Sequence, residues 1–122
     1  MPPRQETLET AVRHMRKQNR KSEDSQGTSK LKNSDGAMCP VGVLIPSERY
    51  SPLLEGWPVK EYDTKGNKQP TPLGDLIVEL GHDLDLVEAL ENIHDLKPVS
   101  LWEQSFRRLA RKFSLTLPKR VS

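Results

Sequence analysis

Three stretches in the second half of the chain repeat apolar residues with the spacing of an α-helix. The stripes consist of Leu73, Leu76, Ile77 and Leu80, then Leu86, Val87, Leu90 and Ile93, and finally Trp102, Phe106, Leu109, Ala110 and Phe113. Short connections between the stretches make the three helices neighbours in space. We therefore predict an α+β, mainly α, fold: a small helical bundle with a short β-hairpin and a proline-rich loop.

Residues at the helix ends support this assignment. Thr71 can cap the first helix with Pro72 at its first position, and Asp83 can cap the second. Ser100 and Glu103 have the spacing of a capping box, which predicts the start of the third helix.

The first half of the chain is less regular. An apolar stripe from Leu8 to Met15 predicts a helix over about residues 7–20 with a basic opposite side. Residues 21–33 have no apolar period and are expected to be a flexible connection. The turn at Asn33-Ser34-Asp35-Gly36 predicts a hairpin with arms at 29–32 and 37–44, and five prolines divide residues 46–72 into loops.

A chain of 122 residues has room for one modest core. We expect residues 1–28 to form a basic N-terminal helix with a flexible linker, residues 29–117 the folded domain, and residues 118–122 a tail. The longest apolar run, residues 41–46, is too short to span a bilayer, and the N-terminus lacks a signal-peptide pattern. We therefore expect a cytoplasmic protein. The location would be the cytoplasm of a bacterial host cell if the resemblance described below holds.

Charge is distributed in three blocks along the chain, basic, then acidic, then basic. One interpretation is that the acidic middle pairs with the basic ends or that each block is a solvated helix face. The alternative is nucleic-acid binding, in which basic helix faces contact phosphates. The residues for this alternative are Arg13, Arg16, Lys17, Arg20, Lys21, Arg107, Arg108 and Arg111, with Lys112 beside them.

The sequence offers no pattern typical of an enzyme. Cys39, the only cysteine, precedes Pro40 in an expected strand and is interpreted as a small buried residue rather than a nucleophile. The pairs His82-Asp83 and His94-Asp95 lie too far apart to share a metal, and neither has a second ligand at helical spacing. We therefore expect no catalytic residues, no metal and no cofactor.

One segment resembles a known group of proteins. Residues 36–46, GAMCPVGVLIP, followed by Tyr50, Pro52, Glu55 and Gly56, resemble small uncharacterised proteins of tailed phages and prophages that share the pattern GxxCxVGxLIPxxxYxPxxEG. The resemblance implies a host-interaction factor, for example an anti-defence or host-takeover protein that binds a host protein. The surface expected to bind comprises Arg49, Tyr50, Trp57, Asp83, Asp85, Glu88 and Glu91; a DNA- or RNA-binding accessory role is the alternative.

Overall fold

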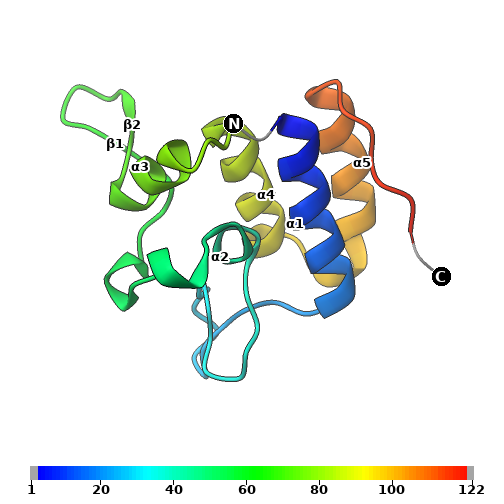
Figure 1. The fold of residues 1–122 in the computed structure, drawn as a ribbon, viewed down its shortest axis with the longest axis horizontal. Coiled ribbons are helices and arrows are strands. Elements are labelled where there is room, and N and C mark those ends of the chain that lie inside the picture. Colours follow the sequence, from blue (N-terminus) through cyan, green and yellow to red (C-terminus); the bar gives the residue numbers. More distant parts are fainter. Residues whose placement is uncertain (1–2, 121–122) are drawn as a thin grey trace.

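The computed structural model describes residues 3–120 and has the predicted mainly helical α+β fold. Its elements are α1 (Arg4–Gln18), α2 (Pro40–Leu44), β1 (Lys60–Tyr62), β2 (Lys68–Pro70), α3 (Pro72–Glu79), α4 (Leu84–Leu96) and α5 (Trp102–Lys112), with 3-10 turns at Ser47–Arg49, Pro52–Leu54 and Val99–Leu101. In Figure 1, α1, α4 and α5 lie side by side, and the β1–β2 hairpin projects from the opposite end of the molecule. No helix in residues 3–120 is long and apolar enough to cross a membrane.

Two apolar cores lie on either side of α4. The first joins α1, α4 and α5 through Leu8, Ala11, Val12, Met15, Leu86, Leu90, Ile93, Trp102, Phe106, Leu109 and Ala110. The second joins α2, α3 and α4 through Leu31, Cys39, Val41, Leu44, Ile45, Val59, Leu73, Leu76, Ile77 and Val87. Because α4 is buried on two sides, His94 is buried and Glu91 half-buried, whereas Asp85 and Asn92 are exposed.

The N-terminal helix is part of the folded unit, so the predicted division between residues 1–28 and 29–117 is wrong. Leu8, Ala11 and Val12 are fully buried, and Arg16 forms two hydrogen bonds to Glu103 of α5, each 2.8 Å long. The apolar stripe of α1 fits α4 and α5, and its burial outweighs the basic character of the other side. Residues 1–2 and 121–122, at the ends of the predicted outer segments, lie outside the described residues.

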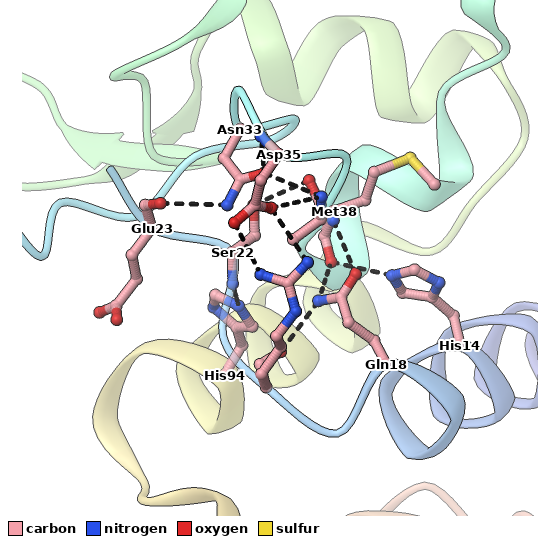
Figure 2. A network of polar contacts seen from close by, with 10 residues as sticks. His14, Gln18, Ser22, Glu23, Asn33, Asp35, Met38 and His94 are labelled. Atoms are coloured by element: carbon pink, nitrogen blue, oxygen red, sulfur yellow. Dashed lines mark hydrogen bonds and ion pairs between the residues drawn. The ribbon is translucent and has the colours of Figure 1, made fainter. Parts of the chain in front are cut away.

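Polar contacts hold the segment after α1, which the sequence predicted to be flexible. Figure 2 shows the contacts: the N–H of the fully buried Ser22 donates to His94 Nε2 at 2.9 Å, and the Asn33 side chain donates to the Glu23 carbonyl at 3.1 Å. The side chain of Gln18 bonds both the N–H and the carbonyl of Met38, at 2.8 and 2.9 Å. Hydrogen bonds therefore order this segment although its sequence has no apolar period.

The predicted turn at residues 33–36 is present, but the hairpin is elsewhere. Asn33 Oδ1 accepts the Ala37 N–H at 2.8 Å, and Gly36 has φ +90°. Beyond the turn only the single bridge between Lys32 and Met38 forms, and residues 40–44 are helical. The antiparallel hairpin is β1–β2 instead, with Tyr62 opposite Lys68 and a polar turn at residues 63–67 between them.

Local cap chemistry explains the helix starts. Thr71 Oγ1 accepts the Gly74 N–H at 3.2 Å, and Asp83 Oδ1 accepts the Leu86 N–H at 2.9 Å, as predicted. The predicted capping box does not form, because Ser100 lies in the 3-10 turn that precedes α5 and Glu103 is taken by Arg16.

Candidate functional site

A pocket of about 330 Å³ lies along the side of α4 that faces α2 and the loop after the second 3-10 turn. Four acids line it, and none of its lining residues is a lysine or arginine. The lining comprises Thr28, Ser29, Leu31, Cys39, Val41, Glu55, Gly56, Trp57, Pro58, Val59, Leu73, Glu88, Glu91, Asn92 and Asp95. The acids are therefore gathered from two separate parts of the chain.

The wall opposite α4 is built by a close approach of two backbones. A Cβ atom at Gly42 would lie 2.0 Å from the Leu31 carbonyl oxygen, so only glycine allows α2 to pack against residue 31. Cys39 caps α2, with its Sγ accepting the Gly42 N–H at 3.3 Å. This places the Cys39 thiol against Glu91 of α4.

Glu91 has an unusual environment. Its Oε2 accepts a hydrogen bond from the Cys39 thiol at 3.1 Å, and its Oε1 lies 3.5 Å from His94 Nδ1. When the Glu91 carboxyl group is protonated, it hydrogen-bonds Asp95. Burial, together with the negative charge of Asp95, raises the pKa of Glu91 from 4.5 to about 8. At neutral pH the carboxyl group is therefore mostly protonated.

Asp95 lies one helical turn further along α4 and accepts a hydrogen bond from His94 Nδ1 at 2.8 Å. Burial acts to raise the pKa of Asp95, but hydrogen bonds from His94 and Ser29 outweigh it and lower the pKa. One neutral carboxyl and one carboxylate thus stand side by side in the pocket.

His94 is committed to structural contacts. Its Nε2 accepts the Ser22 N–H, so the ring proton is on Nδ1, where it is donated to Asp95. The expectation that neither histidine has a second ligand at helical spacing is wrong for His94, because Glu91 precedes it by three residues. Glu91, His94 and Asp95 offer ligand atoms within 4.8 Å of one another, which is a spacing suited to a metal. The imidazole, however, has no free lone pair, and the two remaining carboxyl groups are fewer than the three or four ligands that a zinc site needs.

Cys39 is buried, as predicted, but it caps a helix rather than lying in a strand. A helix N-terminus usually lowers the pKa of a thiol. Here burial and the neighbouring Glu91 raise the pKa of Cys39 well above its ordinary value. The thiol is consequently a hydrogen-bond donor rather than an activated nucleophile.

The pocket brings together three of the residues predicted to bind a partner, namely Trp57, Glu88 and Glu91. Trp57 is 41% exposed. Glu88 is paired with Lys68 of β2 at 3.1 Å.

The other four predicted residues lie outside this pocket and have contacts of their own. Arg49 pairs with Glu79 at 2.8 Å, and the Tyr50 hydroxyl donates to Glu55 at 2.7 Å. Asp83 caps α4 and pairs with Arg4 at 2.9 Å, while Asp85 pairs with Lys60. The acids of α4 therefore do not form one continuous unpaired face.

Sequence reasoning missed Asp95 and Glu55 as pocket residues. Asp95 was considered only with its neighbour His94, although it follows Glu91 by four residues on a helix. Glu55 belongs to the phage-like pattern, and its carboxylate accepts the backbone N–H groups of Leu31 and Lys32 at 2.8 and 3.2 Å. The helical spacing could have revealed Asp95, but only the fold reveals Glu55.

The basic residues proposed for nucleic-acid binding fall into two groups. The three arginines in and just after α1 are ion-paired: Arg13 with Glu9, Arg16 with Glu103 and Arg20 with Asp35. Of the two lysines there, Lys21 donates a hydrogen bond to the Asp95 carbonyl and Lys17 is exposed. On α5, Arg107, Arg108, Arg111 and Lys112 are all exposed, and none is ion-paired within residues 3–120. The free positive charge is thus concentrated on α5.

Comparison with known proteins finds no match to a family model, to a curated protein or to a solved structure. The chemistry of the pocket follows from its own side chains. Three of its four acids are held in place by neutral donors, and Glu88 is paired with Lys68. Its thiol and imidazole are occupied, and Trp57 lines its wall. Such a pocket is suited to binding a positively charged group.

Proposed function

We propose that this chain is a non-enzymatic, phage-derived binding protein that modulates or inhibits a macromolecule of the bacterial host cell. A host protein is the expected partner, for example a component of a defence system. The observation that carries the proposal is the acid-lined pocket beside Glu91, which is concave and includes an exposed aromatic side chain. Binding anchors of this kind are common in protein interfaces.

The way in which the acids are held supports a binding role. Glu55 accepts N–H groups of the backbone, Glu91 accepts the thiol of Cys39, and Asp95 accepts the imidazole of His94. All these donors are neutral, so they fix the positions of the acids without bringing a positive charge into the pocket. A prearranged acidic pocket loses little entropy when a basic group enters it.

The test is capture of host proteins on the immobilised full chain, after nuclease treatment, by the wild type and two matched variants. Trp57→Ser removes the aromatic wall, and Leu101→Ser changes a side chain of similar exposure, 43% against 41%, that does not line the pocket. We expect a host protein that is retained by the wild type and Leu101→Ser and lost with Trp57→Ser. Equal retention by all three proteins contradicts binding at this pocket.

The α5 surface favours a second candidate, nucleic-acid binding by Arg107, Arg108 and Arg111. These side chains have no ion pair to break within residues 3–120, unlike Arg13. Changing all three to glutamate should then abolish binding to a fluorescent oligonucleotide, and Arg13→Glu should weaken it only slightly. An unchanged affinity of the triple variant, with anisotropy measured at several salt concentrations, excludes this candidate.

A further inference from the structure

The C-terminal part of the chain carries positive charge without any acid. Residues 104–120 contain no Asp or Glu, and their cationic side chains are all exposed: Arg107, Arg108, Arg111, Lys112, Lys119 and Arg120. None of these side chains is ion-paired within residues 3–120. The free charge of α5 therefore continues into the segment that follows the helix.

The segment after α5 is attached to the helices, so its charges have a defined place. The Thr116 N–H donates to Gln5 Oε1 at 2.9 Å, and the Pro118 carbonyl accepts a hydrogen bond from Arg16 at 2.7 Å. Leu115 and Leu117 pack against the core formed by α1, α4 and α5. In Figure 1 this segment, drawn in red, runs alongside α5.

The charges of α5 and of the segment after it meet around Glu103. The hydrogen bond from Arg16 is the main reason why the pKa of Glu103 is lowered, and the nearby charges of Arg120 and Arg107 lower it further. Arg107 and Arg120 thus lie near the same carboxylate, whose own charge is offset by its ion pair with Arg16. We call the exposed cations of residues 107–120 the C-terminal basic surface.

We propose that the C-terminal basic surface binds the phosphate backbone of double-stranded DNA. The proposal rests on nucleic-acid binding, the second candidate function above. It adds the form of the nucleic acid and a contribution from Lys119 and Arg120. It does not depend on the pocket beside Glu91.

The density of charge on α5 matches that of a DNA duplex. From Arg107 to Lys112 the helix rises by about 7.5 Å, at roughly 1.5 Å per residue, and presents Arg107, Arg108, Arg111 and Lys112. A duplex carries one phosphate per roughly 1.7 Å of its axis, which gives about four phosphates over that length, whereas one strand carries about two. Only the duplex therefore offers a phosphate to each of these side chains.

The C-terminal basic surface lacks the aromatic side chains on which single strands are bound. Proteins that bind single-stranded nucleic acid stack its bases on exposed aromatic rings. Within residues 104–120 the aromatic residues are Phe106, which is fully buried, and Phe113, which packs against the core under the guanidinium group of Arg4. Neither ring is open to a base, so the contacts of this surface are to phosphates.

Phosphate contacts provide affinity without sequence preference. Arginines dominate the surface, and the planar guanidinium group of arginine can donate two parallel hydrogen bonds to one phosphate. Each neutralised phosphate releases counterions, so the logarithm of the association constant falls with the logarithm of the salt concentration, with a slope of about −0.9 per contact. Contacts from α5 alone give a slope of about −3.6, and contacts from the whole surface give about −5.4.

The experiment measures the fluorescence anisotropy of a labelled DNA duplex of mixed sequence, and of each separated strand, with the full chain at several salt concentrations. We expect the duplex to bind about tenfold or more tightly than either strand, with the slope given above. The fluorescence of the buried Trp102 reports whether each variant is folded.

Three variants test the location of the binding surface. Replacing Arg107, Arg108 and Arg111 by glutamine should reduce the slope by about 2.7, and replacing Lys119 and Arg120 by glutamine should reduce it by about 1.8. The matched control removes the same charge as the first variant from exposed sites outside the surface, in the loop after α2 and in the β1–β2 hairpin. It combines Arg49→Gln, Lys65→Gln and Lys68→Gln, and should bind like the wild type.

The outcomes separate the inference from the functions proposed above. Equal affinity for the duplex and its strands overturns the duplex assignment, but nucleic-acid binding stands if the α5 variant still loses affinity. A control that loses as much slope as the α5 variant overturns the surface, because net charge alone then attracts the DNA. An unchanged slope for the Lys119 and Arg120 variant overturns their contribution. Capture of a host protein at the pocket is measured after nuclease treatment, so that test is independent of these results.

Discussion

Replacing Glu91 by glutamine should make the protein more stable, by an amount that grows with pH. The folded protein holds the Glu91 proton up to about pH 8, whereas the unfolded chain loses it near 4.5. Between these values the folded state binds more protons than the unfolded state, so the free energy of unfolding of the wild type falls as pH rises. Each pKa unit corresponds to about 1.4 kcal/mol, which gives a loss of about 3 kcal/mol between roughly pH 5.5 and pH 8.

Glutamine does not titrate and can make the same contacts. Its carbonyl can accept the Cys39 thiol, and its amide can donate toward Asp95. Because other groups titrate in both proteins, the difference between variant and wild type isolates Glu91. His82, for example, has its pKa lowered by burial and destabilises the fold toward acidic pH in both proteins alike.

The measurement is equilibrium urea unfolding at a series of pH values, followed by the fluorescence of the buried Trp102. We expect the variant to gain about 1 kcal/mol at roughly pH 5.5 and about 4 kcal/mol near pH 8. Parallel stability curves for the two proteins, or a variant less stable than the wild type at alkaline pH, would refute the assignment of Glu91 as a buried protonated acid.

Three further predictions concern the frame of the pocket. Gly42→Ala should lower the free energy of unfolding by at least about 1–3 kcal/mol, measured from the urea midpoint, because the added Cβ meets a backbone oxygen at 2.0 Å. Cys39 should react with iodoacetamide at neutral pH only as fast as the protein opens, since it is 1% exposed; the rate of a free thiol would contradict its burial. Arg16→Met should lower the free energy of unfolding by about 1.5–3 kcal/mol, measured by thermal or urea unfolding, because Glu103 loses a partner that donates two hydrogen bonds. Arg13→Met, at a site that is 64% exposed, should lower it by less than about 1 kcal/mol.

The helices of the second half could be predicted because their signals are local. The apolar stripes, the Thr71 and Asp83 caps and the short connections all act within a few residues, and the observed helices follow them. The capping box failed because Glu103 has a stronger partner in α1, far away in sequence. A short pattern cannot account for competition from a distant residue.

The first half was harder because its order depends on long-range polar contacts. Ser22 is fixed by His94, which lies 72 positions later, and Met38 is fixed by Gln18. No periodicity records such contacts, so the segment resembled a flexible linker. The hairpin arm at residues 37–44 was predicted from the turn before it, but Cys39 and Pro40 provide a helix start there.

Glu91 shows why the pocket itself was invisible in the sequence. It stands in a run of acids on α4 that includes Asp85 and Glu88, and the usual fate of such a run is a solvated face. Asp85 and Glu88 do pair with lysines of the β1–β2 hairpin. Glu91 differs only because α2 and the polar-bonded segment before it lie over this part of α4. Glutamate at this position therefore becomes a buried, protonated group because segments about 50 to 70 positions earlier in the chain pack over it.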